Sequence, residues 1–306
     1  MSDIILHHFP SSPFAEKVRL ALGIKGLEWQ SVTIPMVMPK PLLTALTGGY
    51  RKTPVMQVGA DIYCDTQCIA RALDAMYPQP PLFPQHSEGI AMALSHWGDS
   101  PFFQPGAGLS MGTNKELPDD ILQDRREFFN FIDFETMEAQ LPHFYSQFRA
   151  HLQLLETQLD GGSAYILGDE PGWADIVAYF PLWMARGNIA ATESLVSGLP
   201  ALLSWEKRMQ KTGHGLQTDL PGEQALNIAR IATSKAVEFV TADAWPQGLE
   251  VGSDVSVAPH DYGAVPVIGE LVRLTHTDIA LRRSDPAAGE VVVHFPRIGY
   301  KVETLL

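Results

Sequence analysis

The sequence predicts three domains of different fold class: an α/β domain over residues 1–80, an all-α domain over residues 86–216 and a small, mostly β domain over residues 222–306. Three observations predict this division. Strand and helix patterns alternate before residue 80, the proline-dense segment Pro78–Pro81 is typical of a linker, and beyond Pro221 valine-rich and alternating runs replace helical spacing. A chain of 306 residues exceeds one ordinary domain, which agrees with this division.

The first domain begins with a strand–turn–helix pattern. Ile4–Leu6 predicts a short buried strand, and after a Pro-Ser-Ser-Pro turn the apolar spacing of Phe14–Leu22 predicts an amphipathic helix. Leu27–Ile34 predicts a second strand, followed by a proline-rich loop through Pro41.

The second half of this domain carries a hairpin signal. Thr53–Tyr63 predicts two strands that turn at Gly59–Asp61, and Asp65–Thr66 precedes a helical run that Pro78 ends. The resulting order is β-α-β, loop, β-β-α. An antiparallel hairpin after a βαβ unit is typical of the thioredoxin topology rather than of a doubly wound sheet.

The remaining two domains differ in period. Phe144–Leu159 and Trp173–Met184 have helical spacing, as does Leu226–Ala236. Beyond it, strands separated by turns such as Asp261–Gly263 predict a small all-β barrel, with a β-sandwich as the alternative. The predicted strands are Asp254–Val257, Gly269–Leu274, Asp278–Arg282 and Glu290–His294.

Charge and hydropathy exclude several classes of partner. Lys and Arg total 22 against 35 Asp and Glu, a formal net charge of −13, which repels a nucleic-acid backbone. The N-terminus leads directly into a strand without a signal-like segment, and no apolar stretch approaches roughly 18 residues. We therefore expect a cytoplasmic protein with no nucleic-acid or membrane partner.

The cysteines and histidines indicate no metal site. Cys64 and Cys68 have no second pair to complete a zinc site, and we expect both to be reduced and buried. His260, His276 and His294 lack tight ligand spacing.

Three segments, in order over residues 4–78, resemble motifs of the cytosolic glutathione transferase superfamily. Phe9–Leu22 is similar to the strand-to-helix motif of its serine-type, bacterial-like members, Lys52–Val55 to the cis-proline segment, and Cys64–Leu73 to the acid-Ser helix motif. Leu167–Ile176 resembles the family's capping segment for a buried helix, although Gly172 stands where the family usually has Ser or Thr. The resemblance covers roughly residues 1–215 and leaves the additional C-terminal β domain outside it.

The resemblance implies a thiolate site. A free thiol has a pKa of about 8.5, so glutathione is mostly un-ionised at neutral pH. A hydroxyl donating to the sulfur contributes about 1.5–3 kcal/mol and a helix dipole about 0.3–1 kcal/mol, which together lower the thiol pKa by about one to three units. The motif places Ser12 as this donor, with Ser11 as the alternative and His8 as a further candidate; Ser12 acting only as a helix cap stays open.

The same resemblance assigns the binding residues. Thr53–Pro54, with Pro54 cis, would pair with the cysteinyl unit of glutathione, and Asp65–Thr66 would hold the γ-glutamyl carboxylate at a helix N-terminus. Lys40 and Lys52 match the cations that face the glycyl carboxylate. The alternatives are an ordinary Asp-Thr cap and two solvated lysines.

The expected function is therefore transfer of the glutathione thiolate to a small hydrophobic electrophile by a homodimer, with glutathione as substrate or ligand and no metal. The alternative is an inactive scaffold of the same fold that binds a protein partner through the C-terminal barrel. A thiol oxidoreductase is disfavoured because Ser12 and Ala15 carry no sulfur.

Overall fold

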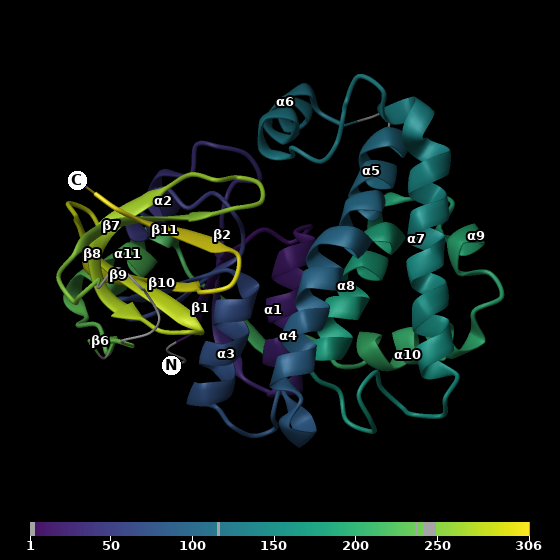
Figure 1. Ribbon diagram of the computed structural model, residues 1–306, viewed down its shortest axis with the longest axis horizontal. Coiled ribbons are helices and arrows are strands. Elements are labelled where there is room, and N and C mark those ends of the chain that lie inside the picture. The colour runs from purple at the N-terminus through teal and green to yellow at the C-terminus, as the bar shows by residue number, and fades with distance from the viewer. Residues whose placement is uncertain (1–3, 115–116, 237, 242–248, 306) are drawn as a thin grey trace. The chain divides into compact units, whose positions relative to one another are not determined.

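The computed structural model describes residues 4–114, 117–236, 238–241 and 249–305 and divides into two compact units (Figure 1). Unit 1 comprises Met1–Ala15, Glu28–Ala72 and Leu216–Leu306, and unit 2 comprises Glu16–Leu27 and Leu73–Gly215. The N-terminal and C-terminal parts of the chain thus share one unit. The three-domain boundaries expected from the sequence stay predictions.

Unit 1 is built on a single sheet, which has 11 strands within the described residues. Its order is β11-β7-β8-β9-β10-β4-β3-β1-β2-β5, with β6 paired to β8. The strands are β1 (Ile4–His8), β2 (Glu28–Thr33), β3 (Val55–Val58), β4 (Asp61–Cys64), β5 (Leu216–Asp219), β6 (Phe239–Val240), β7 (Asp254–Pro259), β8 (Val267–Leu274), β9 (Asp278–Asp285), β10 (Gly289–Pro296) and β11 (Tyr300–Thr304). The unit also contains α2 (Pro41–Thr47), α11 (Gly222–Ile231) and parts of α1 (Pro13–Ile24) and α3 (Thr66–Met76).

The N-terminal half of this sheet has the predicted thioredoxin-like topology. β1 is parallel to β2 and antiparallel to β3, and β3 is antiparallel to β4. The hairpin turns at Gly59, whose φ of +62° lies in the region that glycine adopts without strain. One helix was not predicted: Pro41, expected in the proline-rich loop, is the first residue of α2, a position that proline suits.

The C-terminal strands continue the same sheet. All four predicted strands are present, and β10 pairs in parallel with β4 through Val292↔Asp61 and Val293↔Ile62. The predicted closure into a barrel is not confirmed, because within the described residues β11 pairs with β7, and β10 pairs with β9 and β4.

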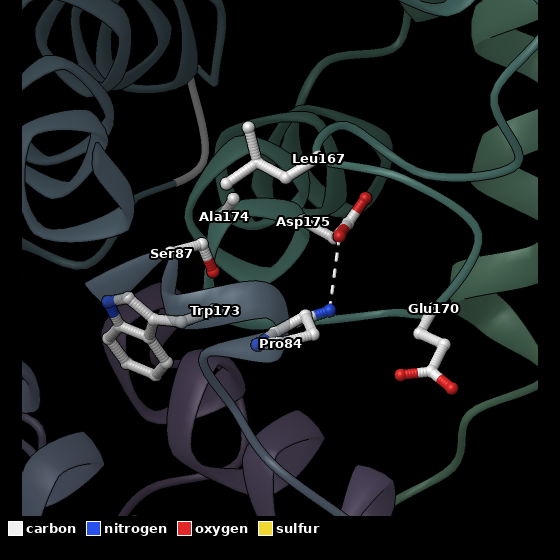
Figure 2. Close-up of a pocket in the computed structure, with 8 residues that line it drawn as sticks. Pro84, Ser87, Leu167, Glu170, Trp173, Ala174 and Asp175 are labelled. Carbon is white, nitrogen blue, oxygen red and sulfur yellow. Dashed lines mark hydrogen bonds between the residues drawn. The ribbon is translucent and has the colours of Figure 1, made fainter. Parts of the chain in front are cut away.

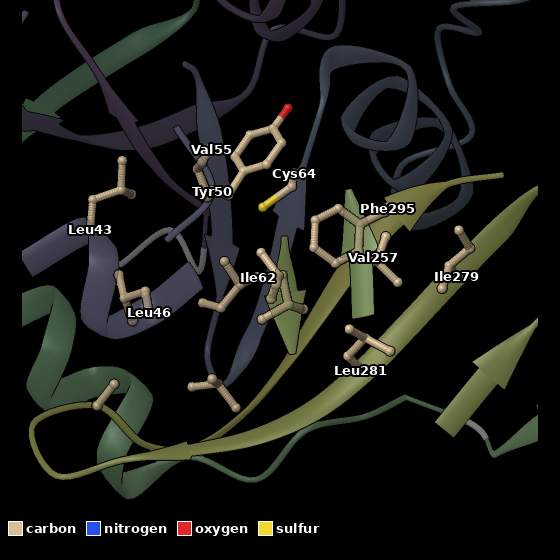
Figure 3. Packing of buried hydrophobic residues seen from close by; sticks show 14 of the residues in the cluster. Leu43, Leu46, Tyr50, Val55, Ile62, Cys64, Val257, Ile279, Leu281 and Phe295 are labelled. Carbon is tan, nitrogen blue, oxygen red and sulfur yellow. The ribbon is translucent and has the colours of Figure 1, made fainter. Parts of the chain in front are cut away.

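One hydrophobic core serves both halves of the sheet (Figure 3). Fully buried side chains from the N-terminal and C-terminal segments belong to the same cluster. Burial of apolar surface stabilises a fold by roughly 25 cal/mol per Å². Since the C-terminal strands bury apolar side chains in the same cluster as the N-terminal strands, they are a structural part of unit 1. Figure 3 labels contributors from both segments, namely Leu43, Leu46, Tyr50, Val55, Ile62, Cys64, Val257, Ile279, Leu281 and Phe295.

Unit 2 is helical, as predicted. It contains the remainder of α1 and α3, η1 (Pro84–His86), α4 (Glu88–Trp97), η2 (Gly98–Phe102), α5 (Phe103–Thr113), α6 (Asp119–Phe128), α7 (Met137–Leu159), α8 (Trp173–Asn188), α9 (Thr192–Val196) and α10 (Pro200–Gln210). No helix in the described part of the chain is both long and apolar enough to span a bilayer.

A buried carboxylate organises the start of α8. Asp175 accepts a hydrogen bond from the backbone N–H of Gly172 (3.1 Å), the dashed line in Figure 2. It also accepts hydrogen bonds from the backbone N–H of Ile166 (2.9 Å) and from the indole N–H of Trp205 (2.8 Å). Burial raises the pKa of Asp175. The Asp half of the expected capping arrangement is therefore present.

Steric space accounts for glycine at the head of α8. A Cβ atom at Gly172 would lie 2.9 Å from the carbonyl oxygen of Leu82 and 2.9 Å from Cδ of Pro84. Both distances are shorter than a carbon can approach without displacing its neighbours. The departure from the usual Ser or Thr thus follows from close packing against the segment before α4.

Candidate functional site

The register of the sheet brings the predicted site segments to one edge. His7 of β1 pairs with Val55 of β3, which pairs with Cys64 of β4. Because β3 is antiparallel to its two neighbours, the segments after β1, before β3 and after β4 leave the sheet at the same edge. These segments carry Phe9–Ser12, Lys52–Pro54 and Asp65–Thr66.

Ser12 is the cap of α1. Its side chain is 2% exposed, and its Oγ accepts a hydrogen bond from the N–H of Ala15 (3.1 Å) at the third position of the helix. Pro13 occupies the first helical position. A hydroxyl has one hydrogen and two acceptor lone pairs, so the same group can cap a helix and donate to a sulfur. The two functions considered for Ser12 are therefore compatible.

The alternatives to Ser12 lie in different surroundings. Ser11 is exposed, and its Oγ is 3.8 Å from the sulfur of Met36. His8 is a buried residue of β1 whose Nε2 is 3.0 Å from Oγ of Ser31 and whose ring packs edge-on against Trp29. Of the two serines, Ser12 is the one that caps α1.

Thr53 and Lys40 are in contact. The Thr53–Pro54 peptide is cis, as predicted, and Lys40 Nζ donates to Oγ1 of Thr53 (3.2 Å). Lys40 is buried, with its Nζ 5.7 Å from the ring centroid of Phe9. Lys40 is thus not a solvated surface lysine.

Asp65 is fixed by bonds to both carboxylate oxygens. Its backbone has a φ of +75°, its Oδ1 accepts from the N–H of Gln67 (2.9 Å) at the start of α3, and its Oδ2 accepts from the hydroxyl of Tyr300 (3.0 Å). The Tyr300 oxygen is also 3.0 Å from that of Tyr50. Thr66 is buried and is the first residue of α3.

The two tyrosines are held in the neutral form. Burial raises the pKa of Tyr50 and of Tyr300 well above the ordinary tyrosine value, and the negative charge of Asp65 raises both further. A neutral Tyr300 hydroxyl can donate to Asp65 over the whole physiological pH range.

Lys52 contacts the loop between β7 and β8. Its Nζ lies 2.6 and 2.8 Å from the two carboxylate oxygens of Asp261 and 4.2 Å from the ring centroid of Tyr262. Lys52 is therefore an ion-paired residue in this structure, unlike the solvated lysine considered as the alternative.

The C-terminal contacts to the site were not expected from the sequence. Asp261, Tyr262 and Tyr300 lie more than 200 positions after the residues that they contact. In the sequence, Asp261 and Tyr262 indicate only a turn. No local pattern reports which distant strands share a sheet.

The cysteines are buried and free, as expected. Burial is the largest cause that raises the pKa of Cys64 and of Cys68, which disfavours the reactive thiolate. Among the described residues, no group of three or more His, Cys, Asp or Glu side chains is placed to hold a metal ion.

Comparisons with known proteins agree with the predicted architecture. Residues 6–81 match the family model described as glutathione S-transferase, N-terminal domain, and residues 138–208 match that described as glutathione S-transferase, C-terminal domain. Glutathione S-transferase U22 of Arabidopsis thaliana is 25% identical over 74% of this chain and 94% of its own length. Glutathione S-transferase U4 of the same plant is 27% identical over 44% of this chain, and the match spans 60% of that relative.

Solved structures separate the common fold from the C-terminal extension. A glutathione S-transferase from Rhodospirillum rubrum F11 shares the fold over 68% of this chain and 87% of its own, with a TM-score of 0.52 and 20% identity. A GST-like protein from Pseudomonas syringae is 39% identical, covers 100% of both chains and has a TM-score of 0.80. Since this likeness extends over the full length and includes the C-terminal strands, the chain belongs to the glutathione S-transferase family.

Proposed function

We propose that this protein binds glutathione in unit 1 and transfers its thiolate to a small hydrophobic electrophile, with Ser12 as the donor to the sulfur. The observation that carries the proposal is the convergence of Ser12, Thr53–Pro54 and Asp65–Thr66 at one edge of the sheet. The names of the curated relatives support a transferase. These comparisons do not favour the alternative of an inactive scaffold.

The chemistry assigned to these residues follows from their positions. The hydroxyl of Ser12, at the positive end of α1, donates to the sulfur and so favours the thiolate over the thiol. The backbone of Thr53 pairs with the cysteinyl unit, and the N-terminus of α3 at Asp65–Thr66 receives the γ-glutamyl carboxylate. Lys40 and Lys52 supply positive charge for the glycyl carboxylate.

Calorimetry with glutathione on the full chain tests binding, and conjugation of an activated aryl halide tests transfer. We expect Ser12→Ala to reduce conjugation by about 10- to 100-fold, because a hydrogen bond to a charged group contributes about 1.5–3 kcal/mol. Ser12→Gly is the matched variant, since glycine keeps helix capping within a few tenths of a kcal/mol but has no hydroxyl.

Ser11→Ala distinguishes the two serines. If Ser11→Ala removes conjugation while both Ser12 variants retain it, the donor is Ser11. If the protein binds no glutathione and conjugates none, the proposed function is wrong.

We also propose a cytoplasmic homodimer, as is common for the family to which the chain belongs. Sedimentation velocity of the purified chain measures the assembly directly. A species of twice the 33.7 kDa chain mass is expected, and a monomer at micromolar concentration would contradict the dimer.

A further inference from the structure

The loop between β7 and β8 places a carboxylate on a cation of the proposed glutathione site. Asp261 approaches Lys52 Nζ with both oxygens, at 2.6 and 2.8 Å. The side chain of Lys52 is 14% exposed and that of Asp261 is 48% exposed. The ion pair is thus largely covered on the lysine side and about half exposed to solvent on the aspartate side.

The backbone around Asp261 is held in place. The N–H of His260 donates to the carbonyl of Gly299 (3.1 Å), and the N–H of Val265 donates to that of Gly263 (2.8 Å). Tyr262 is buried, and its ring lies 4.2 Å from Lys52 Nζ. These contacts hold the Asp261 carboxylate beside Lys52.

An ammonium group that is already paired with one carboxylate attracts a second carboxylate less strongly. Asp261 neutralises the charge of Lys52, and a ligand carboxylate entering beside it meets a like charge at short range. Recognition of a free carboxylate by Lys52 therefore competes with an interaction within the chain.

We propose that Asp261 is a specificity-determining residue of the glutathione site. By competing for Lys52, it lowers the preference of the site for a thiol peptide with a free glycyl carboxylate over one whose glycyl end is neutral. This inference rests on the proposed function and adds to it the class of thiol that the site accepts. Lys40 is present in the unsubstituted protein and in every variant below, so its contribution to carboxylate binding cancels when their affinity ratios are compared.

Calorimetry of the full chain with two ligands, glutathione and its glycyl ethyl ester, tests the inference. Asp261→Asn is expected to raise the ratio of the two association constants, glutathione over ester, by about three- to tenfold, the range given by exposed to partly buried ion pairs. Asp254→Asn makes the same charge change at the opposite end of β7 and is expected to leave the ratio unchanged. In a Lys52→Gln background, Asp261→Asn is expected to give no gain.

Two results would overturn the inference. If glutathione binds and Asp261→Asn leaves the ratio unchanged, Asp261 does not compete for Lys52, whether both affinities stay the same or both rise equally through a general charge effect. In that case the proposed function stands. Failure of every variant to bind either ligand, with unchanged circular dichroism and melting temperature, contradicts the proposed function and this inference together.

Discussion

Removing the hydroxyl of Tyr300 is expected to destabilise unit 1 by at least about 2 kcal/mol. Tyr300→Phe loses the hydrogen bond that Tyr300 donates to the Asp65 carboxylate, which contributes about 1.5–3 kcal/mol, and the one that it accepts from Tyr50, which contributes about 0.5–1.5 kcal/mol. It also leaves the hydroxyl of Tyr50, on a side chain that is 4% exposed, without this partner. Phenylalanine keeps the ring contact with Phe295, so the expected cost is that of the two lost hydrogen bonds, at least about 2 kcal/mol.

The matched variant is Tyr50→Phe, which loses the contact with Tyr300 but leaves the bond from Tyr300 to Asp65. Its expected cost is about 1 kcal/mol. Urea unfolding at neutral pH, followed by circular dichroism, measures both variants against the unsubstituted protein. If Tyr300→Phe costs no more than Tyr50→Phe, the bond to Asp65 contributes nothing, and the C-terminal strand does not anchor the site.

Three further predictions concern stability. Gly172→Ser introduces a residue that is usual at this cap, but crowding against Leu82 is expected to lower the melting temperature and to reduce the free energy of unfolding by about 1–3 kcal/mol. A higher melting temperature would contradict the packing argument. Burial lowers the pKa of His7 to about 4, so the neutral form is favoured in the folded state. The contribution of neutral His7 to the free energy of unfolding is therefore full above pH about 6.5, and on the order of 3 kcal/mol is lost as the pH falls through 4. His7→Asn should flatten this part of the unfolding curve measured against pH, and an unchanged slope would argue against it. Because the pKa of Tyr300 is raised by burial, its contribution is full below pH about 10 and is lost at higher pH; Tyr300→Phe should therefore unfold less steeply in alkali, and an equal slope would contradict this.

Much of unit 1 is predictable from local patterns. The apolar spacing of Phe14–Leu22 and the turn at Gly59–Asp61 identify the helix and the hairpin because both signals lie within a few residues of the elements they define. The sequence predicts a loop through Pro41 because proline clusters usually interrupt structure, but proline is also favoured at the first helical position, which Pro41 occupies in α2.

The pairing of distant strands was not predictable in the same way. The periodicity of Glu290–His294 predicts a strand, but it says nothing about a partner, and β4 lies more than 200 residues earlier. Buried and exposed side chains alternate over Tyr300–Thr304. Over only five residues, many loops have the same pattern, so it does not identify a strand. The contacts of Asp261 and Tyr300 with the site depend on that strand pairing, so they could not be predicted without it.

The sequence places Ser12 at a helix start and leaves open whether its hydroxyl caps the helix. Capping depends on the distance between Oγ and the N–H of Ala15, which is 3.1 Å in the structure.

Titration of the bound thiol tests the central claim most directly. The ultraviolet absorbance of the thiolate, followed against pH with glutathione bound, gives the pKa of the sulfur in the site. A pKa about one to three units below that of the free thiol is expected for the unsubstituted protein, with a rise of at least about one unit in Ser12→Gly. A bound thiol that titrates like free glutathione, or a pKa that Ser12→Gly leaves unchanged, would contradict the assignment of Ser12 as the donor.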